Sequence, residues 1–221
     1  ETACRSVDGV TIDRLDGLAQ ASGLKLRLSD HGIPETDIPM LAKEAMKQTR
    51  LLVSQTKVFA KAVLFGDVEK AKSLYAKTRM QYERVEPVAE AFGDLDPSID
   101  GREDTVPPQD FKGFHRIEKA LWDENTTGPV RFVATDLLAD VKRLEGIVFT
   151  IALTPGQIAS GANELLSEVS TSKITGEEER YSHTDLWDFQ ANVEGAKAAF
   201  DSVKPMLVQV DPALAKEIDQ R

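Results

Sequence analysis

The chain is predicted to fold as an all-α protein, built as one antiparallel helical bundle or a pair of bundles. Apolar residues recur at helical spacing in long segments, and Gly, Pro and Asp residues separate these segments. The sequence contains no hairpin signal and no long alternation of polar and apolar residues. About seven or eight helices are expected, a number that suits an antiparallel bundle.

The first two helices are expected at about 11–23 and 38–64. An apolar stripe marks the first of them, formed by Ile12, Leu15, Leu18 and Ala19. The second ends at Gly66. Asp67 is a favourable N-cap for a third helix, which keeps the 3.6-residue period until Pro87 interrupts it.

An acidic loop is expected at 93–104, and helices follow at about 111–122 and 130–152. Thr154 and Pro155 resemble an N-cap and the first residue of a helix that runs to about 169. This order predicts that the acidic loop leads directly into the helix at 111–122.

The last third of the chain begins with a polar loop at 175–180. Ser182 or Thr184 then starts a helix that runs to about 204, and a short helix follows it. His183 and Asp185 lie at the start of this helix. They are explained by the capping of its first backbone N–H groups and by the preference for acidic residues at the positive end of a helix.

The amino-acid composition limits the classes of function that are possible. The formal charge of −10, from 37 acidic and 27 basic residues, argues against nucleic-acid binding, because a polyanion would be repelled. The charge is compatible with cationic ligands, although an acidic surface is also simply a soluble one. A single cysteine, Cys4, cannot form an intrachain disulfide. No apolar run approaches the ~18 residues of a membrane span.

His115 and Glu118 are the central candidates for a functional site. They lie three residues apart in a predicted helix, so their side chains share a face, with Cβ atoms about 5–6 Å apart. They sit one position beside the apolar stripe of Phe114, Ile117 and Leu121, at the edge of the buried face. Together they could bind one metal ion; the alternative is a pair satisfied by a hydrogen bond or by water.

Further acidic groups surround this pair in the sequence. Glu83 and Glu86 are also three residues apart, and two acidic clusters lie at 96–104 and 177–179. Each cluster taken alone is also explained by a solvated turn. In combination they offer many oxygen donors and one imidazole, a donor set that suits hard cations such as Ca²⁺, Mn²⁺ and iron.

Several catalytic patterns are absent from the sequence. It contains no His-Glu-x-x-His helix of zinc proteases, no Glu-x-x-His of di-iron bundles, no phosphate-binding glycine loop and no Gly-x-Ser-x-Gly elbow. The chain is therefore not expected to be an enzyme.

Long segments of the chain resemble a known family. The segments are 82–87, 94–104, 113–121 and 176–195, of which the last two are the most specific. Over residues 51–221 the chain is similar to the imelysin-like domain of EfeO-type periplasmic iron-uptake proteins. It looks like the short form without a cupredoxin domain, which includes an alginate-binding member.

The resemblance implies a periplasmic, all-helical protein with a metal site in a cleft. Its His-x-x-Glu motif maps to His115 and Glu118. The companion ligands that it implies are Glu83, Glu86, Asp96 and Glu178. Iron is the implied metal, with copper, zinc or calcium as alternatives. The implied partners are an inner-membrane iron permease and a periplasmic peroxidase.

The two ends of the chain depart from this family. Residues 1–50 are expected to be a helical segment of different ancestry, because 23–34 and 37–50 resemble the C-terminal helices of iron-dependent alcohol dehydrogenases. The imelysin-like domain at 51–221 is expected to stop short of the last pair of helices of the family. An alcohol dehydrogenase function is not expected, since the chain has no cofactor site.

Two alternative functions remain open from the sequence. The first is metal-dependent binding of an acidic polysaccharide such as alginate, with Arg79, Arg84, Arg102 and Arg116 as basic candidates. The second is a metallopeptidase, which would need an open coordination position and a general base. Metal content and the effect of chelation would separate these alternatives from iron uptake.

Overall fold

The protein is all-α, as predicted. The structure, a computed structural model, describes residues 6–7, 10–11, 39–150 and 153–220. Within these residues it contains eight α-helices, labelled α2 to α9, joined by short 3-10 turns. The expected helix at about 11–23 and the segment at 23–34 lie almost entirely outside the described residues.

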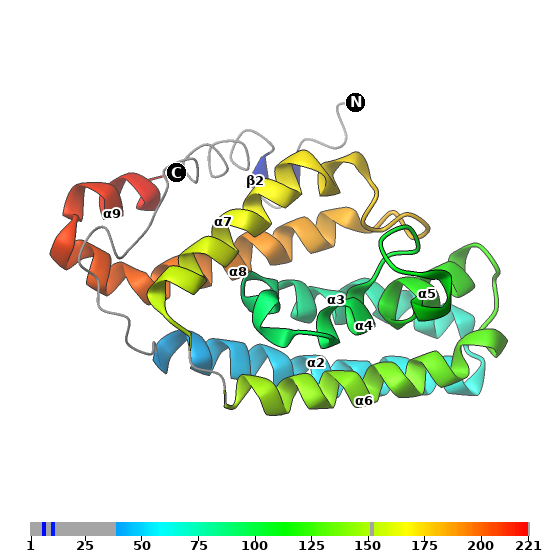
Figure 1. The fold of residues 1–221 in the computed structure, drawn as a ribbon. Coiled ribbons are helices and arrows are strands. Elements are labelled where there is room, and N and C mark those ends of the chain that lie inside the picture. Colours follow the sequence, from blue (N-terminus) through cyan, green and yellow to red (C-terminus); the bar gives the residue numbers. More distant parts are fainter. Residues whose placement is uncertain (1–5, 8–9, 12–38, 151–152, 221) are drawn as a thin grey trace.

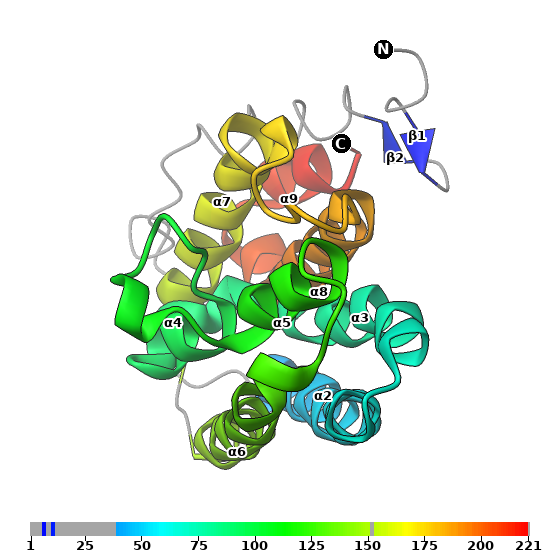
Figure 2. The same cartoon turned by 90° about the vertical axis from the view of Figure 1, so that its right-hand side faces the viewer.

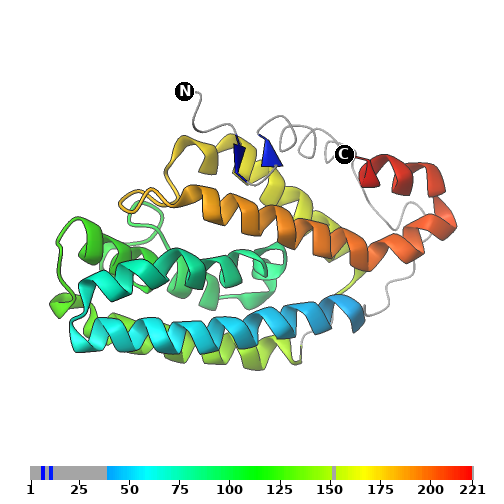
Figure 3. The same ribbon diagram turned by 180° about the vertical axis from the view of Figure 1, so that it is seen from behind.

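The helices form three layers (Figures 1 and 2). The first layer pairs α2, Pro39–Phe65, with α6, Arg131–Val148. The middle layer holds α3, Val68–Glu83, with α4, Leu95–Asp100, and α5, Gly113–Trp122. The third layer pairs α7, Pro155–Thr171, with α8, Asp185–Val210. In the view from behind, α9, Pro212–Asp219, turns back at the end of α8 (Figure 3).

Four 3-10 turns complete the connections. They are η2 Glu86–Phe92, η3 Pro108–Asp110, η4 Gly128–Val130 and η5 Lys173–Thr175. Strands β1, Ser6–Val7, and β2, Val10–Thr11, pair antiparallel. The sequence pattern does not predict these strands, because two residues are too few to show an alternation.

The predicted helix starts are confirmed where capping side chains mark them. Asp67 accepts a hydrogen bond from the backbone N–H of Lys70 at the start of α3. Thr154 caps α7 in a reciprocal capping box with Gln157, and Pro155 is the first helical residue. α2 continues through residues 50 and 51 without interruption.

The acidic stretch at 93–104 was expected to be a loop, and this expectation is wrong for its middle part. Residues 95–100 form α4, because Leu95 and Ile99 are four residues apart and both bury their side chains in the core. Pro97 is tolerated because the third residue of a helix has no backbone partner for its N–H. α8 also runs further than predicted, through Pro205 to Val210.

One hydrophobic core runs through the layers. Its largest buried members include Phe59 on α2, Phe114, Ile117 and Leu121 on α5, and Leu137 on α6. A smaller cluster of Leu165, Val169 and Phe189 joins α7 to α8. The apolar face of α5 thus anchors this helix, and its neighbouring face carries His115 and Glu118.

Close backbone approaches set the position of the middle layer. A Cβ atom on Gly161 of α7 would lie 1.9 Å from the carbonyl oxygen of Pro87, and one on Gly195 of α8 would lie 2.6 Å from that of Arg84. Gly113 begins α5 with a φ of +75°, and a Cβ there would lie 2.2 Å from the carbonyl oxygen of Ile99. Glycine at 113 therefore lets α5 start against the end of α4, next to Asp100.

We expect Gly113→Ala to destabilise the protein by about 2–4 kcal/mol, because alanine disfavours this backbone conformation and collides with Ile99. Denaturant unfolding followed by circular dichroism measures the effect. Gly146→Ala on α6 is the control, since no atom lies within 4 Å of the added Cβ. It should stabilise by about 0.5–1 kcal/mol. Equal stabilities for the two variants would contradict this account of the contact between α4 and α5.

Candidate metal centre

His115 and Glu118 are both buried on α5, with relative exposures of 2% and 0%. The Nδ1 atom of His115 lies 3.3 Å from Oε2 of Glu118. The other oxygen of Glu118 accepts backbone N–H bonds from Tyr181, at 2.9 Å, and Ser182, at 2.7 Å. Glu118 therefore joins α5 to the 176–184 loop and holds the imidazole ring in one orientation.

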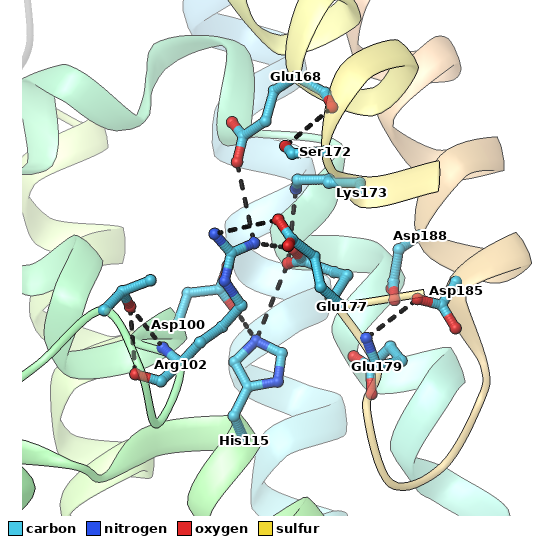
Figure 4. A network of polar contacts seen from close by, with 12 residues as sticks. Asp100, Arg102, His115, Glu168, Ser172, Lys173, Glu177, Glu179, Asp185 and Asp188 are labelled. Carbon is cyan, nitrogen blue, oxygen red and sulfur yellow. Dashed lines mark hydrogen bonds and ion pairs between the residues drawn. The ribbon is translucent and has the colours of Figure 1, made fainter. Parts of the chain in front are cut away.

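The second nitrogen of His115 faces two carboxylates from other elements. Its Nε2 atom lies 3.4 Å from Oδ1 of Asp100, at the end of α4, and 3.8 Å from Oε1 of Glu178 in the 176–184 loop. Among the described residues this buried nitrogen has no hydrogen-bond partner of good geometry. Figure 4 shows His115 rising from α5 toward this group, with Lys173 approaching from the opposite side.

Two sets of three side chains have ligand atoms close enough to bind one ion. The first consists of Asp100, His115 and Glu178, and the second of His115, Glu118 and Glu179. Within each set the ligand atoms lie within 4.8 Å of one another. Both sets use His115, and they differ in the side of the imidazole ring that they surround.

Buried cations neutralise part of the surrounding negative charge. Arg79 on α3 and Lys173 on η5 are fully enclosed, with exposures of 0% and 1%. They face more carboxylates than they can neutralise. The buried or partly buried carboxylates are Glu83, Glu86, Asp100, Glu118, Glu178, Glu179 and Asp188. Burial of such an excess is costly unless protons or a further cation compensate it.

The pKa values of the acidic groups reflect this excess. Burial raises the pKa of Glu179 and Asp188 well above the ordinary values. Repulsion from Asp188 and Glu118 adds to the rise at Glu179, and repulsion from Glu83 and Glu178 adds to it at Asp188. Glu178 behaves differently: Lys173 and Arg79 outweigh burial and lower its pKa. Glu178 is thus ionised, whereas Glu179 and Asp188 hold protons more readily.

His115 is protonated at neutral pH in the metal-free protein. Burial and the charge of Arg79 both act to lower the pKa of His115, but the carboxylates of Asp100 and Glu118 outweigh them and raise it to about 9. Those two carboxylates respond in the opposite direction, since the pKa of each is lowered against the effect of burial. A metal ion at this site would therefore compete with a proton on His115.

Glu83 and Glu86, two of the predicted ligands, gather around Lys173. The ammonium group lies 3.3 Å from Oε2 of Glu83 and 2.8 Å from Oε1 of Glu86. The amide of Asn192 donates to both carboxylates, at 2.9 Å and 2.7 Å. These carboxylates lie next to the two ligand sets and belong to neither of them.

Asp96 also lies beside the ligand sets and outside them. It accepts a hydrogen bond from the hydroxyl of Tyr82. Burial raises the pKa of Asp96 to about 6, and repulsion from Asp100 and Glu83 supports the rise against the effect of the Tyr82 hydrogen bond. Of the predicted ligands, the structure therefore brings together His115, Glu118 and Glu178, while Glu83, Glu86 and Asp96 form a neighbouring shell.

Sequence reasoning did not select Asp100 and Glu179 as ligands, although both lie in the acidic clusters that it noted. The sequence does not show which way each acidic side chain points. Glu178 and Glu179 are buried, whereas the side chain of Glu177 is 38% exposed and lies near Arg102. Arg79 was considered only as a surface group for polysaccharide. Its four-residue spacing to Glu83 predicts an ion pair on one face of α3 but gives no sign of its complete burial.

An aromatic cluster lies beneath the charged groups. Phe59, Tyr75, Phe114 and Trp122 pack with ring centroids 5.3–6.2 Å apart. The guanidinium carbon of Arg79 lies 5.6 Å from the centroid of Phe114. These rings exclude water from one side of the site, so the charges above them interact more strongly than they would at the surface.

Comparison with known proteins places the chain in a family. The family model described as imelysin matches residues 40–221. The chain belongs to the imelysin family. Its imelysin domain thus contains all of the α-helices described here except the first residue of α2.

The imelysin domain is also similar to named proteins. It is 49% identical over 178 residues to "Iron uptake system component EfeO" of Escherichia coli strain K12 and of Shigella flexneri. The match covers 79% of this chain and 48% of each relative. The chain thus spans about half the length of the curated relatives that it matches. None of the described helices is long and apolar enough to cross a membrane.

The raised pKa of Asp96 predicts a pH-dependent stability. A carboxyl group whose pKa rises from 3.8 to about 6 on folding favours the folded state below pH 4, and this contribution is lost as the pH rises through 6. Asp96→Asn should remove that loss and stabilise the protein by about 1–2 kcal/mol at pH 8, a value reduced for the partial exposure of the side chain.

Urea unfolding at pH 4 and pH 8 tests this expectation. Asp94→Asn is the matched control, since Asp94 is exposed and lies two residues away. A gain for Asp96→Asn that is the same at both pH values would show that the carboxyl group is not the cause.

Proposed function

We propose that this imelysin domain binds iron as cargo, as a component of a periplasmic iron-uptake system. The observation that carries the proposal is the buried Nε2 atom of His115, which faces Asp100 and Glu178 and has no hydrogen-bond partner of good geometry in the described part of the chain. The similarity to EfeO, which is named as an iron uptake system component, supports iron as the cargo.

The donor atoms suit this cargo. One imidazole and several carboxylates form a set that iron accepts readily, and that manganese, copper, zinc and calcium accept to differing degrees. The excess of buried carboxylates over Arg79 and Lys173 adds a reason, because a bound cation would replace the proton on His115 as a counter-charge to them.

We assign the ion to the Nε2 side of His115, with Asp100 and Glu178 as the other ligands. Glu118 then acts as the carboxylate that holds Nδ1 and orients the ring, a common arrangement around metal-binding histidines. Its second oxygen is already occupied by two backbone N–H groups, which supports this role. The alternative places the ion between His115, Glu118 and Glu179.

Glu83, Glu86 and Asp96 are proposed to surround the ligands without binding the ion themselves. They would need to leave Lys173, Asn192 and Tyr82 to reach an ion at His115. We therefore propose that they act through their negative potential.

The proposed role is that of a carrier without catalytic activity. Its expected partners are an inner-membrane iron permease and a periplasmic peroxidase. A polysaccharide role is less well supported, because Arg79 is fully buried. The other candidate cations, Arg84, Arg102 and Arg116, are each paired with an acidic side chain and only 20% exposed.

We expect His115→Asn, Asp100→Asn and Glu178→Gln each to weaken metal binding by about 100-fold or more, because each removes a ligand. Glu118→Gln should weaken it by about 10–100-fold. Calorimetry with Fe²⁺ under anaerobic conditions measures these affinities, with Cu²⁺, Zn²⁺ and Ca²⁺ for comparison.

The control for these measurements is His183→Asn, since His183 is exposed and its φ of +55° is tolerated by asparagine. If Asp100→Asn binds as tightly as wild type and Glu118→Gln does not bind, the ion lies on the Nδ1 side. If wild type binds none of the four metals, the proposed function fails.

Metal binding should release about one proton near pH 7, because the His115 imidazole is protonated in the free protein, with a pKa of about 9. Affinity should then fall about tenfold for each pH unit below neutrality. Calorimetry in two buffers of different ionisation enthalpy counts the proton directly. An affinity that stays constant between pH 5 and pH 8 would count against His115 as a ligand.

A further inference from the structure

Arg79 holds the centre of the charged cluster. Its Nη2 atom lies 2.5 Å from Oε1 of Glu83 and 3.1 Å from Oε1 of Glu178. Its Nη1 atom donates to Oδ1 of Asp100, and its Nε atom lies 2.5 Å from Oε1 of Glu179. A fifth carboxylate, on Asp188, lies 3.7 Å from Nε.

Two of these contacts use the same oxygen atoms that face His115. Oδ1 of Asp100 is the acceptor for Arg79 and also lies 3.4 Å from Nε2 of His115. Oε1 of Glu178 lies 3.1 Å from Arg79 and 3.8 Å from the same Nε2 atom. An ion bound to His115 at Nε2 through these nearest oxygen atoms would therefore compete for them with the guanidinium.

We propose that Arg79 is a built-in competing cation: it occupies the Asp100 and Glu178 oxygens in the metal-free protein and yields them when an ion binds. This inference rests on the proposed function and deepens it. Arg79 weakens binding, because its own favourable interactions are lost when the metal arrives, and it speeds release, because it can return to the same oxygens.

The surroundings allow the guanidinium to change partners without leaving the cluster. Glu83, one helical turn away on α3, and Glu179 remain as partners of the guanidinium. Asp188 on α8 is fully buried, and neither of its carboxylate oxygens has a hydrogen-bond partner among the described residues. Asp188 is therefore positioned to receive the guanidinium when Asp100 and Glu178 turn to the ion.

A double-mutant cycle tests this exchange, with Zn²⁺ as a redox-inert probe. Arg79→Gln should bind Zn²⁺ about tenfold more tightly than wild type and release it more slowly to a chelator. Asp188→Asn should bind about threefold or more weakly, because the guanidinium loses its second position. In the Arg79→Gln background the Asp188 substitution should have no further effect, since it acts through Arg79.

The cycle separates competition from a purely structural or general electrostatic role. Loss of the Asp188 carboxyl group would weaken binding equally in both backgrounds if Asp188 acted on the ion without Arg79. Arg143→Gln is the control, since Arg143 is a surface residue paired with Asp140 on α6. It should leave Zn²⁺ binding unchanged.

Arg79→Lys covers the case in which Arg79→Gln does not fold without metal. Lysine keeps the charge and lacks the planar fork that reaches several carboxylates, so this variant should also bind Zn²⁺ more tightly than wild type. Weaker or unchanged binding in the folded Arg79 variants would overturn the inference and leave the proposed function intact. Absence of binding in wild type would instead remove the proposed function itself.

Discussion

The neutralisation of buried carboxylates is the constraint on which this structure depends. Acidic side chains from α3, α4, α5, α8 and the 176–184 loop meet in one enclosed region, and Arg79 and Lys173 lie among them. Without these cations the region would hold an uncompensated charge, which proteins avoid. Several of the ion pairs also join two layers of helices, since Lys173 pairs with Glu83 of α3 and Arg79 lies close to Asp188 of α8.

The helical scaffold serves this region in two ways. Glycines at 113, 161 and 195 allow close backbone contacts, so the ends of α3, α4 and α5 and the flanks of α7 and α8 meet within a small volume. The aromatic rings of Phe59, Tyr75, Phe114 and Trp122 exclude water from one side. Close packing and the exclusion of water on this side together strengthen the interactions between the charged groups.

A metal carrier must satisfy two requirements, and different groups of the proposed site would serve each of them. The ligands must attract a cation strongly enough to take it up, and the protein must also be able to give the cation away. In the proposed function, the carboxylates and the imidazole of His115 would meet the first requirement. An internal guanidinium that shares their oxygen atoms would meet the second, because release then exchanges one cation for another and leaves little unbalanced charge behind.

By itself the sequence determined the helical fold and the residue pair at the centre of the proposed site. Helical periodicity, the caps at Asp67 and Thr154, and the three-residue spacing of His115 and Glu118 are local properties, so they can be read from neighbouring residues. α4 was missed because its two buried contacts, Leu95 and Ile99, lie within an acidic stretch typical of a loop.

Only the tertiary structure decided which acidic residues meet His115. The approach of Gly113 to Ile99 brings Asp100 to the ring, and the turn at 176–184 directs Glu178 and Glu179 inward while it leaves Glu177 near the surface. The tertiary structure also decided that Arg79 lies at the centre of the buried carboxylates. Such choices depend on contacts between distant segments, and side chains of the same type have the same local pattern whether they face the core or the solvent.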